Sequence, residues 1–380
     1  MVKHVTLQSK RSSWDRPRQR YASVCRFIAV FWGLHLLFGL AVARGAEPPR
    51  PAVAAPKLRQ TFNLKVSEFE LSLVGHIYLA FSPDSRLFAY GKKGDFAIWD
   101  LHKQKEVRTL SSDYTHETYS VTFTPDSKQL VMAGARRRKP DPDRSEARFW
   151  SVATGEVVRT VDSPGSLVLH LTFSPDGKHF ATGDQNGCVK VWETATGKQL
   201  RTYRDLGKNV YMVGYNAAGK SCAVVQGEET WGFFDLEGQK RIATLGSRGD
   251  PVEAELSRDG KLLATAHRND GKAHIWDTTT GKCLATWEVD KRSHAGVERI
   301  CFVPGKEHLI VCQSNKVWAW DPHAKRPFWT LDPLKDFPKR ALPYWIRDIR
   351  VSPDGKWLAI YSYNGDDRWF DLWELVPARP

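Results

Sequence analysis

The sequence has few of the residue patterns that catalysis usually requires. It contains three methionines and six cysteines, and no two cysteines lie three positions apart. A C-x-x-C zinc clamp and a C-x-x-C-H haem attachment site are therefore excluded. The patterns H-E-x-x-H, G-x-S-x-G and H-x-H are also missing, and the twelve histidines are scattered. These absences predict a protein that is not an enzyme and has no cofactor and no metal site.

The cysteines do not predict a disulfide framework either. Cys25 precedes an apolar run, and the other five are odd in number and widely spaced. Small buried strand residues are the expected role for most of them. Cys301 and Cys312 flank one predicted hairpin and could pair in an oxidising compartment, so their state stays open at this point.

Long apolar runs are confined to the N-terminus. Residues 1–46 hold eight Lys and Arg against one acid, with an apolar run over 27–43 and small residues after it. This pattern predicts a signal peptide or an uncleaved signal anchor, with the N-terminus in the cytoplasm. The rest of the chain would be extracytoplasmic, periplasmic or secreted, with a possible membrane tether through 27–43. Residues 47–56 are rich in Pro and Ala and are expected to form a linker.

The basic charge is concentrated in the same segment. The formal net charge is +13, and more than half of it comes from residues 1–46. The remainder is only mildly basic, so nucleic acid is not the predicted partner.

From residue 57 onward the chain repeats. A turn motif with an apolar residue, Ser or Thr, Pro, Asp, and Gly or Ser recurs in full at Phe81, Phe123, Phe173 and Val351, and in degenerate form three more times. Pro and Asp suit the central turn positions, and Gly accepts the left-handed conformation. An aromatic followed by an acid or Ser comes 17 to 26 residues later. These aromatics are Trp99, Trp150, Trp192, Phe234, Trp276, Trp320 and Trp373. Each unit is therefore expected to hold four short strands.

The turn and the Trp-Asp ending resemble the WD-repeat family over residues 57–380. The resemblance implies an all-β fold, a seven-bladed β-propeller of four-stranded antiparallel blades. The Gly-His pair that family members carry at the start of a repeat is missing at its expected position, so apolar packing between sheets is expected to hold the blades together. The last unit lacks a fourth strand, and Lys57 to Phe62 resembles one. An N-terminal strand is therefore expected to close the ring.

One apparent nucleotide motif conflicts with this register. Residues 214–221 read Gly-Tyr-Asn-Ala-Ala-Gly-Lys-Ser, which matches G-x-x-x-x-G-K-[ST]. A phosphate-binding loop needs a helix after the Lys. The repeat places a turn at Tyr215 to Gly219 and a strand after it, so no nucleotide site is predicted.

Two loops carry candidate partner-binding residues. The loop of the second unit contains Arg136, Arg137 and Arg138, a possible docking patch for an acidic partner. The alternative is a solvated hairpin neutralised by its own acids. The long connector 333–345 contains Phe337, Lys339, Arg340, Tyr344 and Trp345, a composition typical of interface anchors. The alternative is that its aromatics fold back on their own unit.

The resemblance implies a function, since WD-repeat proteins mostly act as interaction scaffolds, and the chain resembles exported bacterial examples. We therefore expect a non-catalytic extracytoplasmic scaffold that binds protein or envelope-polymer partners. The alternative is a propeller enzyme, lactonase-like or dehydrogenase-like, with a site at the central channel. An acidic or His-lined channel would favour the enzyme, and small apolar residues would favour the scaffold.

Overall fold

The computed structural model describes only part of the chain. The described ranges are 56–65, 79–92, 95–111, 116–136, 144–164, 166–216, 218–226, 230–247, 253–267, 270–288, 296–305, 308–313, 315–321, 326–332, 345–364 and 367–375. All of them belong to the second of two compact units, Pro49–Pro380. The predicted signal segment 1–46, and the linker 47–56 except for Pro56, lie outside them. None of the described residues forms a helix long and apolar enough to cross a membrane.

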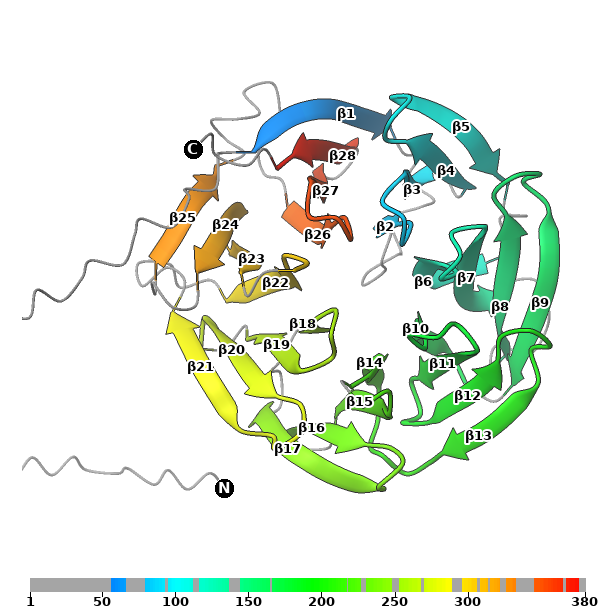
Figure 1. The fold of residues 1–380 in the computed structure, drawn as a ribbon, viewed down its shortest axis with the longest axis vertical. Coiled ribbons are helices and arrows are strands. Elements are labelled where there is room, and N and C mark those ends of the chain that lie inside the picture. Colours follow the sequence, from blue (N-terminus) through cyan, green and yellow to red (C-terminus); the bar gives the residue numbers. More distant parts are fainter. Residues whose placement is uncertain are drawn as a thin grey trace, which may run out of the picture. The chain divides into compact units, whose positions relative to one another are not determined.

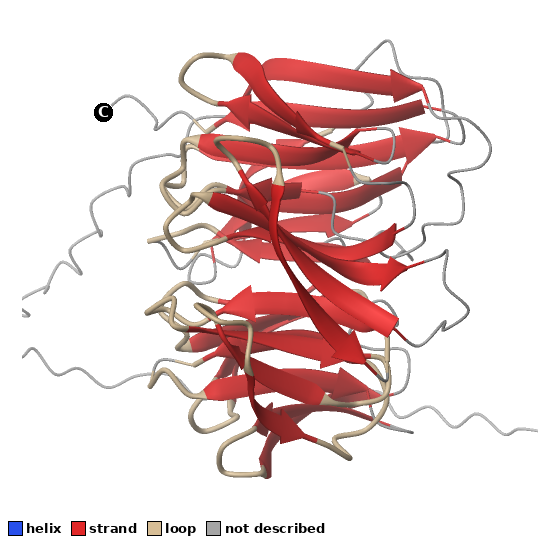
Figure 2. Ribbon diagram, turned by 90° about the vertical axis from the view of Figure 1, so that its right-hand side faces the viewer, coloured by secondary structure: helices blue, strands red, loops and turns tan. Residues whose placement is uncertain are grey.

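The second unit is a ring of seven four-stranded antiparallel sheets, which confirms the predicted seven-bladed propeller (Figure 1). In each blade the first strand of the sheet lies nearest the centre of the ring and the fourth lies at its rim. Seen from the side, the strands run from one face of the ring to the other (Figure 2). The turns between first and second strands and between third and fourth strands therefore share one face, because neighbouring strands are antiparallel.

The blades follow the order of the chain. Blade 1 holds β2 (Leu79–Phe81), β3 (Leu87–Lys92), β4 (Asp95–Asp100) and β5 (Lys105–Leu110); blade 2 holds β6 (His116–Phe123), β7 (Gln129–Arg136), β8 (Arg144–Ser151) and β9 (Val157–Pro164); blade 3 holds β10 (Val168–Phe173), β11 (His179–Asp184), β12 (Val189–Glu193) and β13 (Gln199–Tyr203). Blade 4 holds β14 (Val210–Tyr215), β15 (Ser221–Gln226), β16 (Thr230–Asp235) and β17 (Lys240–Ser247); blade 5 holds β18 (Glu253–Leu256), β19 (Leu262–Ala266), β20 (Lys272–Asp277) and β21 (Cys283–Glu288). Blade 6 holds β22 (Val297–Phe302), β23 (Leu309–Gln313), β24 (Lys316–Asp321) and β25 (Arg326–Leu331); blade 7 holds β26 (Trp345–Val351), β27 (Trp357–Asn364), β28 (Asp367–Glu374) and β1 (Lys57–Lys65).

The repeated turn is closed by its own side chains. In blade 7 the Ser352 hydroxyl donates to Asp354 Oδ1 at 2.6 Å and accepts the Trp357 N–H at 2.9 Å. The same carboxylate oxygen accepts the Lys356 N–H at 3.1 Å. The residue after the Asp has a positive φ, which Gly355 adopts without steric cost. The turn motif is therefore a local hydrogen-bond unit that sets the register of the second strand.

Two turns carry Ser instead of Gly at the positive-φ position. Ser85 and Ser127 have φ values of 56° and 61°. The Ser85 hydroxyl accepts the Asp354 N–H of blade 7 at 2.9 Å, and the Ser127 hydroxyl accepts the Asp84 N–H of blade 1 at 3.3 Å. These hydrogen bonds between blades offset the cost of a left-handed backbone.

Apolar packing between blades forms the core, as predicted. Each pair of neighbouring blades encloses one cluster of buried apolar residues among the described part of the chain. The aromatics that end the third strands pack into these clusters toward the preceding blade; they are Trp99, Trp150, Trp192, Phe234, Trp276, Trp320 and Trp373. One recurrent sequence mark therefore supplies one large apolar side chain to every blade interface.

The N-terminal strand closes the ring, as expected. β1 pairs antiparallel with β28 from Lys57 opposite Glu374 to Lys65 opposite Asp367. The Thr61 hydroxyl donates to the buried Asp371 Oδ1 at 2.8 Å. Pairing with β1 removes the edge that β28 would otherwise expose.

The structure also decides two smaller questions. Gly214 and Tyr215 end β14, and Ser221 begins β15, so a strand and not a helix follows Lys220, and the predicted register is confirmed. Cys301 and Cys312 are buried free thiols in β22 and β23. They do not pair, because Cys301 lies opposite Ile310 and Cys312 lies opposite Arg299.

Replacement of Phe62 tests the closure of the ring. The Phe62 ring lies 4.6 Å from that of Tyr90 and 4.8 Å from that of Trp99, both in blade 1. We expect Phe62→Ala to lower the free energy of unfolding by about 2–4 kcal/mol, since it removes a packed aromatic that joins blade 7 to blade 1. Denaturant unfolding measures the change, and exposed Lys57→Ala is the control. A Phe62→Ala variant as stable as the parent would contradict this closure.

Candidate functional site

The predicted basic loop lies mostly outside the described residues. Arg136 ends β7 in blade 2, opposite His116 of β6. Its side chain, and Arg137 and Arg138, are outside the described part of the chain. Their role as a docking patch stays a prediction.

Of the connector 333–345, the described part of the structure includes only the last residue, Trp345. Trp345 begins β26 in blade 7, is 41% exposed, and packs on Tyr363 of the same blade at a ring distance of 5.4 Å. Phe337, Lys339, Arg340 and Tyr344 lie outside the described residues. Blade 1 separates Trp345 from Arg136, so the two predicted groups start from blades that are not neighbours.

A cluster of charged side chains that the sequence reading did not single out lies on the innermost strands of blades 5, 6 and 7. We call Glu253, Glu255, Arg299, Asp348 and Arg350 the axial cluster. Arg350 Nη1 lies 3.6 Å from Glu253 Oε1 and 3.5 Å from Glu255 Oε2, and its Nη2 lies 3.3 Å from Asp348 Oδ1. Arg299 Nε lies 3.2 Å from Glu253 Oε2. Blade 7 thus contacts blade 5 directly, past the inner strand of blade 6.

Burial and charge perturb the acids of this cluster. Burial raises the pKa of Glu255 to about 7, although Arg350 and the Phe302 N–H act in the opposite direction. Burial likewise raises the pKa of Asp348 to about 6 against the effect of Arg350. The pKa of Arg350 is raised by Asp348, Glu253 and Glu255 despite its burial. The Arg350 guanidinium therefore stays charged, while the Glu255 carboxyl has a pKa close to neutral pH.

The same inner strands use side chains to satisfy backbone groups of the next blade. Glu255 Oε1 accepts the Phe302 N–H of blade 6 at 3.2 Å. His170 Nδ1 accepts the Val213 N–H of blade 4 at 3.3 Å. Burial, and then the charge of Arg350, lowers the pKa of His170 to about 4, so this imidazole is a neutral acceptor. Axial polar residues thus tie adjacent blades together.

The axial cluster matches neither the acidic or His-lined channel expected of an enzyme nor the small apolar lining expected of a scaffold. Its three carboxyls are paired with two guanidinium groups. The sequence does contain a pattern that could have predicted this cluster, namely charged residues at the same position of successive repeats. Glu253, Arg299 and Asp348 all stand three positions before the first residue of the repeated turn.

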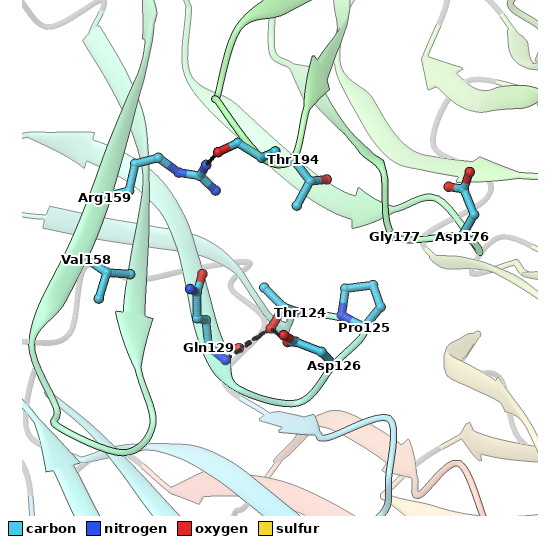
Figure 3. Close-up of a pocket in the computed structure, with 10 residues that line it drawn as sticks. Thr124, Pro125, Asp126, Gln129, Val158, Arg159, Asp176, Gly177 and Thr194 are labelled. Atoms are coloured by element: carbon cyan, nitrogen blue, oxygen red, sulfur yellow. Dashed lines mark hydrogen bonds between the residues drawn. The ribbon is translucent and has the colours of Figure 1, made fainter.

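A cleft of about 570 Å³ lies between blades 2 and 3 (Figure 3). Its lining comes from the repeated turns of both blades, from the start of β9 and from the turn after β12; the residues are Thr124, Pro125, Asp126, Gln129, Val158, Arg159, Asp176, Gly177, Thr194 and Ala195. Arg159 Nη1 donates to the Ala195 carbonyl at 2.8 Å and links the two blades. The Arg159 guanidinium also stacks 4.1 Å from the Phe149 ring centroid. These contacts hold one wall of the cleft in place.

The cleft combines negative charge with an exposed apolar side chain. Hydrogen bonds from the Ser174 hydroxyl and the Lys178 N–H lower the pKa of Asp176. The pKa of Asp126 is also lowered, because hydrogen bonds from Thr124 and Lys128 outweigh its burial. Both carboxylates are ionised at neutral pH. Val158, on the β9 side of the cleft, is 52% exposed (Figure 3).

Comparison with known proteins supports the fold assignment. Residues 155–193 match the family described as WD domain, G-beta repeat. The chain is 27% identical over 229 residues to WD repeat-containing protein 90 of Homo sapiens, covering 57% of this chain and 13% of that protein. It is 25% identical over 271 residues to Nuclear distribution protein nudF of Aspergillus niger, covering 68% of this chain and 53% of that protein. It is 22% identical over 253 residues to Jouberin of Rattus norvegicus, covering 60% and 23%.

The chain is thus a β-propeller with WD-repeat relatives, and it spans about half or less of the length of these three proteins. None of the three comes from a bacterium. The expected resemblance to exported bacterial examples therefore stays a prediction.

The raised pKa of Glu255 generates a pH test. The Glu255 carboxyl binds its proton more tightly in the folded protein than in the unfolded chain, where its pKa is near 4.5. The parent protein therefore loses stability as the pH rises from about 4.5 toward 7. Glu255→Gln cannot ionise and keeps an acceptor for the Phe302 N–H. We expect its unfolding free energy relative to the parent to rise by roughly 1–3 kcal/mol between pH 5 and pH 8. Exposed Glu156→Gln is the control, and a pH-independent difference would contradict the assignment.

Proposed function

We propose that the protein is a non-catalytic interaction scaffold and that the cleft between blades 2 and 3 binds an extended segment of a partner protein. The observation that carries the proposal is the cleft itself, about 570 Å³ in volume and built from the turns of two blades. Its WD-repeat relatives support a role in protein binding. Clefts of this size accommodate a few side chains of a partner.

The lining defines the chemistry of the segment. Val158 offers an apolar contact at the edge of the cleft, and Asp126 and Asp176 offer two carboxylates from adjacent blades. A segment with one apolar and one basic side chain complements this surface. Two carboxylates against the single guanidinium of Arg159 leave the lining net negative, which favours a basic protein segment over an anionic envelope polymer.

The alternative function is a propeller enzyme with a site at the centre of the ring, and the axial cluster is the observation in its favour. Glu255 and Asp348 have the raised pKa values that general acids and bases often show. However, both carboxyls are within 3.5 Å of Arg350, and Glu255 also accepts a backbone N–H. These partners give both residues a structural role in joining blades, which favours the scaffold.

We also propose an extracytoplasmic location for the propeller, periplasmic or secreted. The proposal rests on the sequence of residues 1–46, in which basic residues precede the apolar run 27–43. Residues 47–56 would then connect the signal or anchor to the ring.

Fractionation of the native protein tests this location. A cleaved signal predicts a soluble protein whose N-terminus falls between Arg44 and Glu47. An uncleaved anchor predicts a membrane-bound protein that resists extraction by high salt, because salt does not screen apolar insertion. N-terminal sequencing distinguishes the two. A propeller accessible to protease only from the cytoplasmic side would exclude both.

Replacement of Val158 tests the cleft. We expect Val158→Arg to weaken partner binding at least tenfold, since it removes the apolar contact and places a bulky cation in a cleft proposed to bind a basic segment. Leu284→Arg is a matched control, because Leu284 is also 52% exposed and is likewise the second residue of a fourth strand. Partners captured by the parent are identified, and their dissociation constants are then measured against each variant. Equal affinity for Val158→Arg and the parent would exclude the cleft.

A further inference from the structure

A group of possible metal ligands lies in blade 5, at the turn between its second and third strands. His267 follows β19, Asp270 lies in the turn, and His274 is in β20. One ligand atom from each residue lies within 4.8 Å of the other two. The two imidazole rings are 4.4 Å apart at an angle of 66°.

Both imidazoles are oriented by threonine hydroxyls. His267 Nε2 lies 2.9 Å from Thr265 Oγ1, which also accepts the Trp276 Nε1–H at 2.9 Å. His274 Nδ1 lies 2.9 Å from Thr286 Oγ1, while its Nε2 faces Asp270 Oδ2 at 3.7 Å. Hydrogen bonds on one ring nitrogen are the usual way in which proteins orient a metal-binding histidine.

We propose that His267, Asp270 and His274 bind a zinc-type divalent transition-metal ion. Two imidazoles and one carboxylate form a donor set suited to zinc, nickel or copper rather than to calcium or magnesium. Ligands of a tetrahedral zinc ion lie roughly 3.3 Å apart for bonds of about 2.0–2.1 Å. The 3.7 Å separation of His274 Nε2 and Asp270 Oδ2 is close to this value. Because all three ligand atoms lie within 4.8 Å of one another, binding requires them to close by at most about 1.5 Å.

The three residues are placed so that a metal ion can reach them and so that their side chains are held in position. His267 is buried, the His274 side chain is 16% exposed, and the Asp270 side chain is 39% exposed. An ion can therefore enter from the side of Asp270. Asp270 Oδ1 accepts the Lys272 N–H at 3.0 Å, which fixes the carboxylate. The Lys272 ammonium lies 3.8 Å from Asp270 Oδ2, and the ion would displace it.

Three protein ligands leave at least one coordination position for water or for a group of a partner. The site lies on the face of the ring opposite to the cleft between blades 2 and 3, since it is formed by a turn between second and third strands. Its existence is independent of the proposed cleft function. Metal binding would clamp the turn and the start of β20.

Calorimetric titration of the full, untagged chain with Zn²⁺ after chelator treatment tests the site. We expect one ion to bind tightly, and His274→Ala and Asp270→Asn to weaken its binding at least tenfold. Exposed His102→Ala, in blade 1, is the matched control and should leave the affinity unchanged.

Two further measurements keep the proposal testable if a histidine variant folds poorly. Thr286→Val retains all three ligands and should still weaken Zn²⁺ binding about tenfold, because it frees the His274 ring. Cu²⁺ substituted into the parent should give an electron paramagnetic resonance spectrum with coupling to two nitrogens. The site is excluded if Asp270→Asn and Thr286→Val bind Zn²⁺ as the parent does, or if the Cu²⁺ spectrum lacks nitrogen coupling.

Discussion

Burial of both faces of every blade is the constraint on which the rest of the structure depends. A four-stranded sheet with apolar side chains on both faces cannot cover them alone, so each blade needs two neighbours. A linear stack of blades would leave one apolar face exposed at each end, whereas a closed ring covers both faces of every blade. The pairing of β1 with β28 in blade 7 follows from this constraint, because it joins the first and last strands of the propeller in one sheet. The interface of blades 7 and 1 accordingly encloses a cluster of buried apolar residues, as the other interfaces do.

Closure creates a second requirement at the centre of the ring. The innermost strand of each blade has one edge without a strand partner, and its backbone groups are crowded together near the axis. Polar side chains from adjacent blades meet this requirement, as Glu255 does for the Phe302 N–H and His170 for the Val213 N–H. Once buried, these groups need their own charge partners, and Arg350 supplies one from blade 7. The raised pKa of Glu255 thus has a sufficient cause in its burial near the axis of the ring.

The sequence predicted the features that are local and repeated. The turn at Ser352 is closed by residues within five positions of one another, and Trp373 packs into a blade interface because every blade repeats that geometry. Sites that combine distant residues could not be predicted in the same way. Glu255 and Arg350 are 95 residues apart and meet only because the ring curves. His267, Asp270 and His274 are close in sequence, yet their ligand atoms converge because β19 pairs with β20 so that Thr265 lies opposite His274 and His267 lies diagonally across from it. No periodicity encodes that geometry.

Antiparallel strands give the ring two chemically separate faces. The turns after first and third strands, with the start of β9, build the cleft that contains Val158, Asp126 and Asp176. The opposite face holds Arg136 at the end of β7 and the group formed by His267, Asp270 and His274. Between them lie interfaces of close-packed apolar side chains, which resist gradual deformation. Within the described strands, a ligand on one face therefore meets a rigid layer between itself and the other face. For a scaffold this separation means that two partners can be held at once, and that the ring fixes the distance between them.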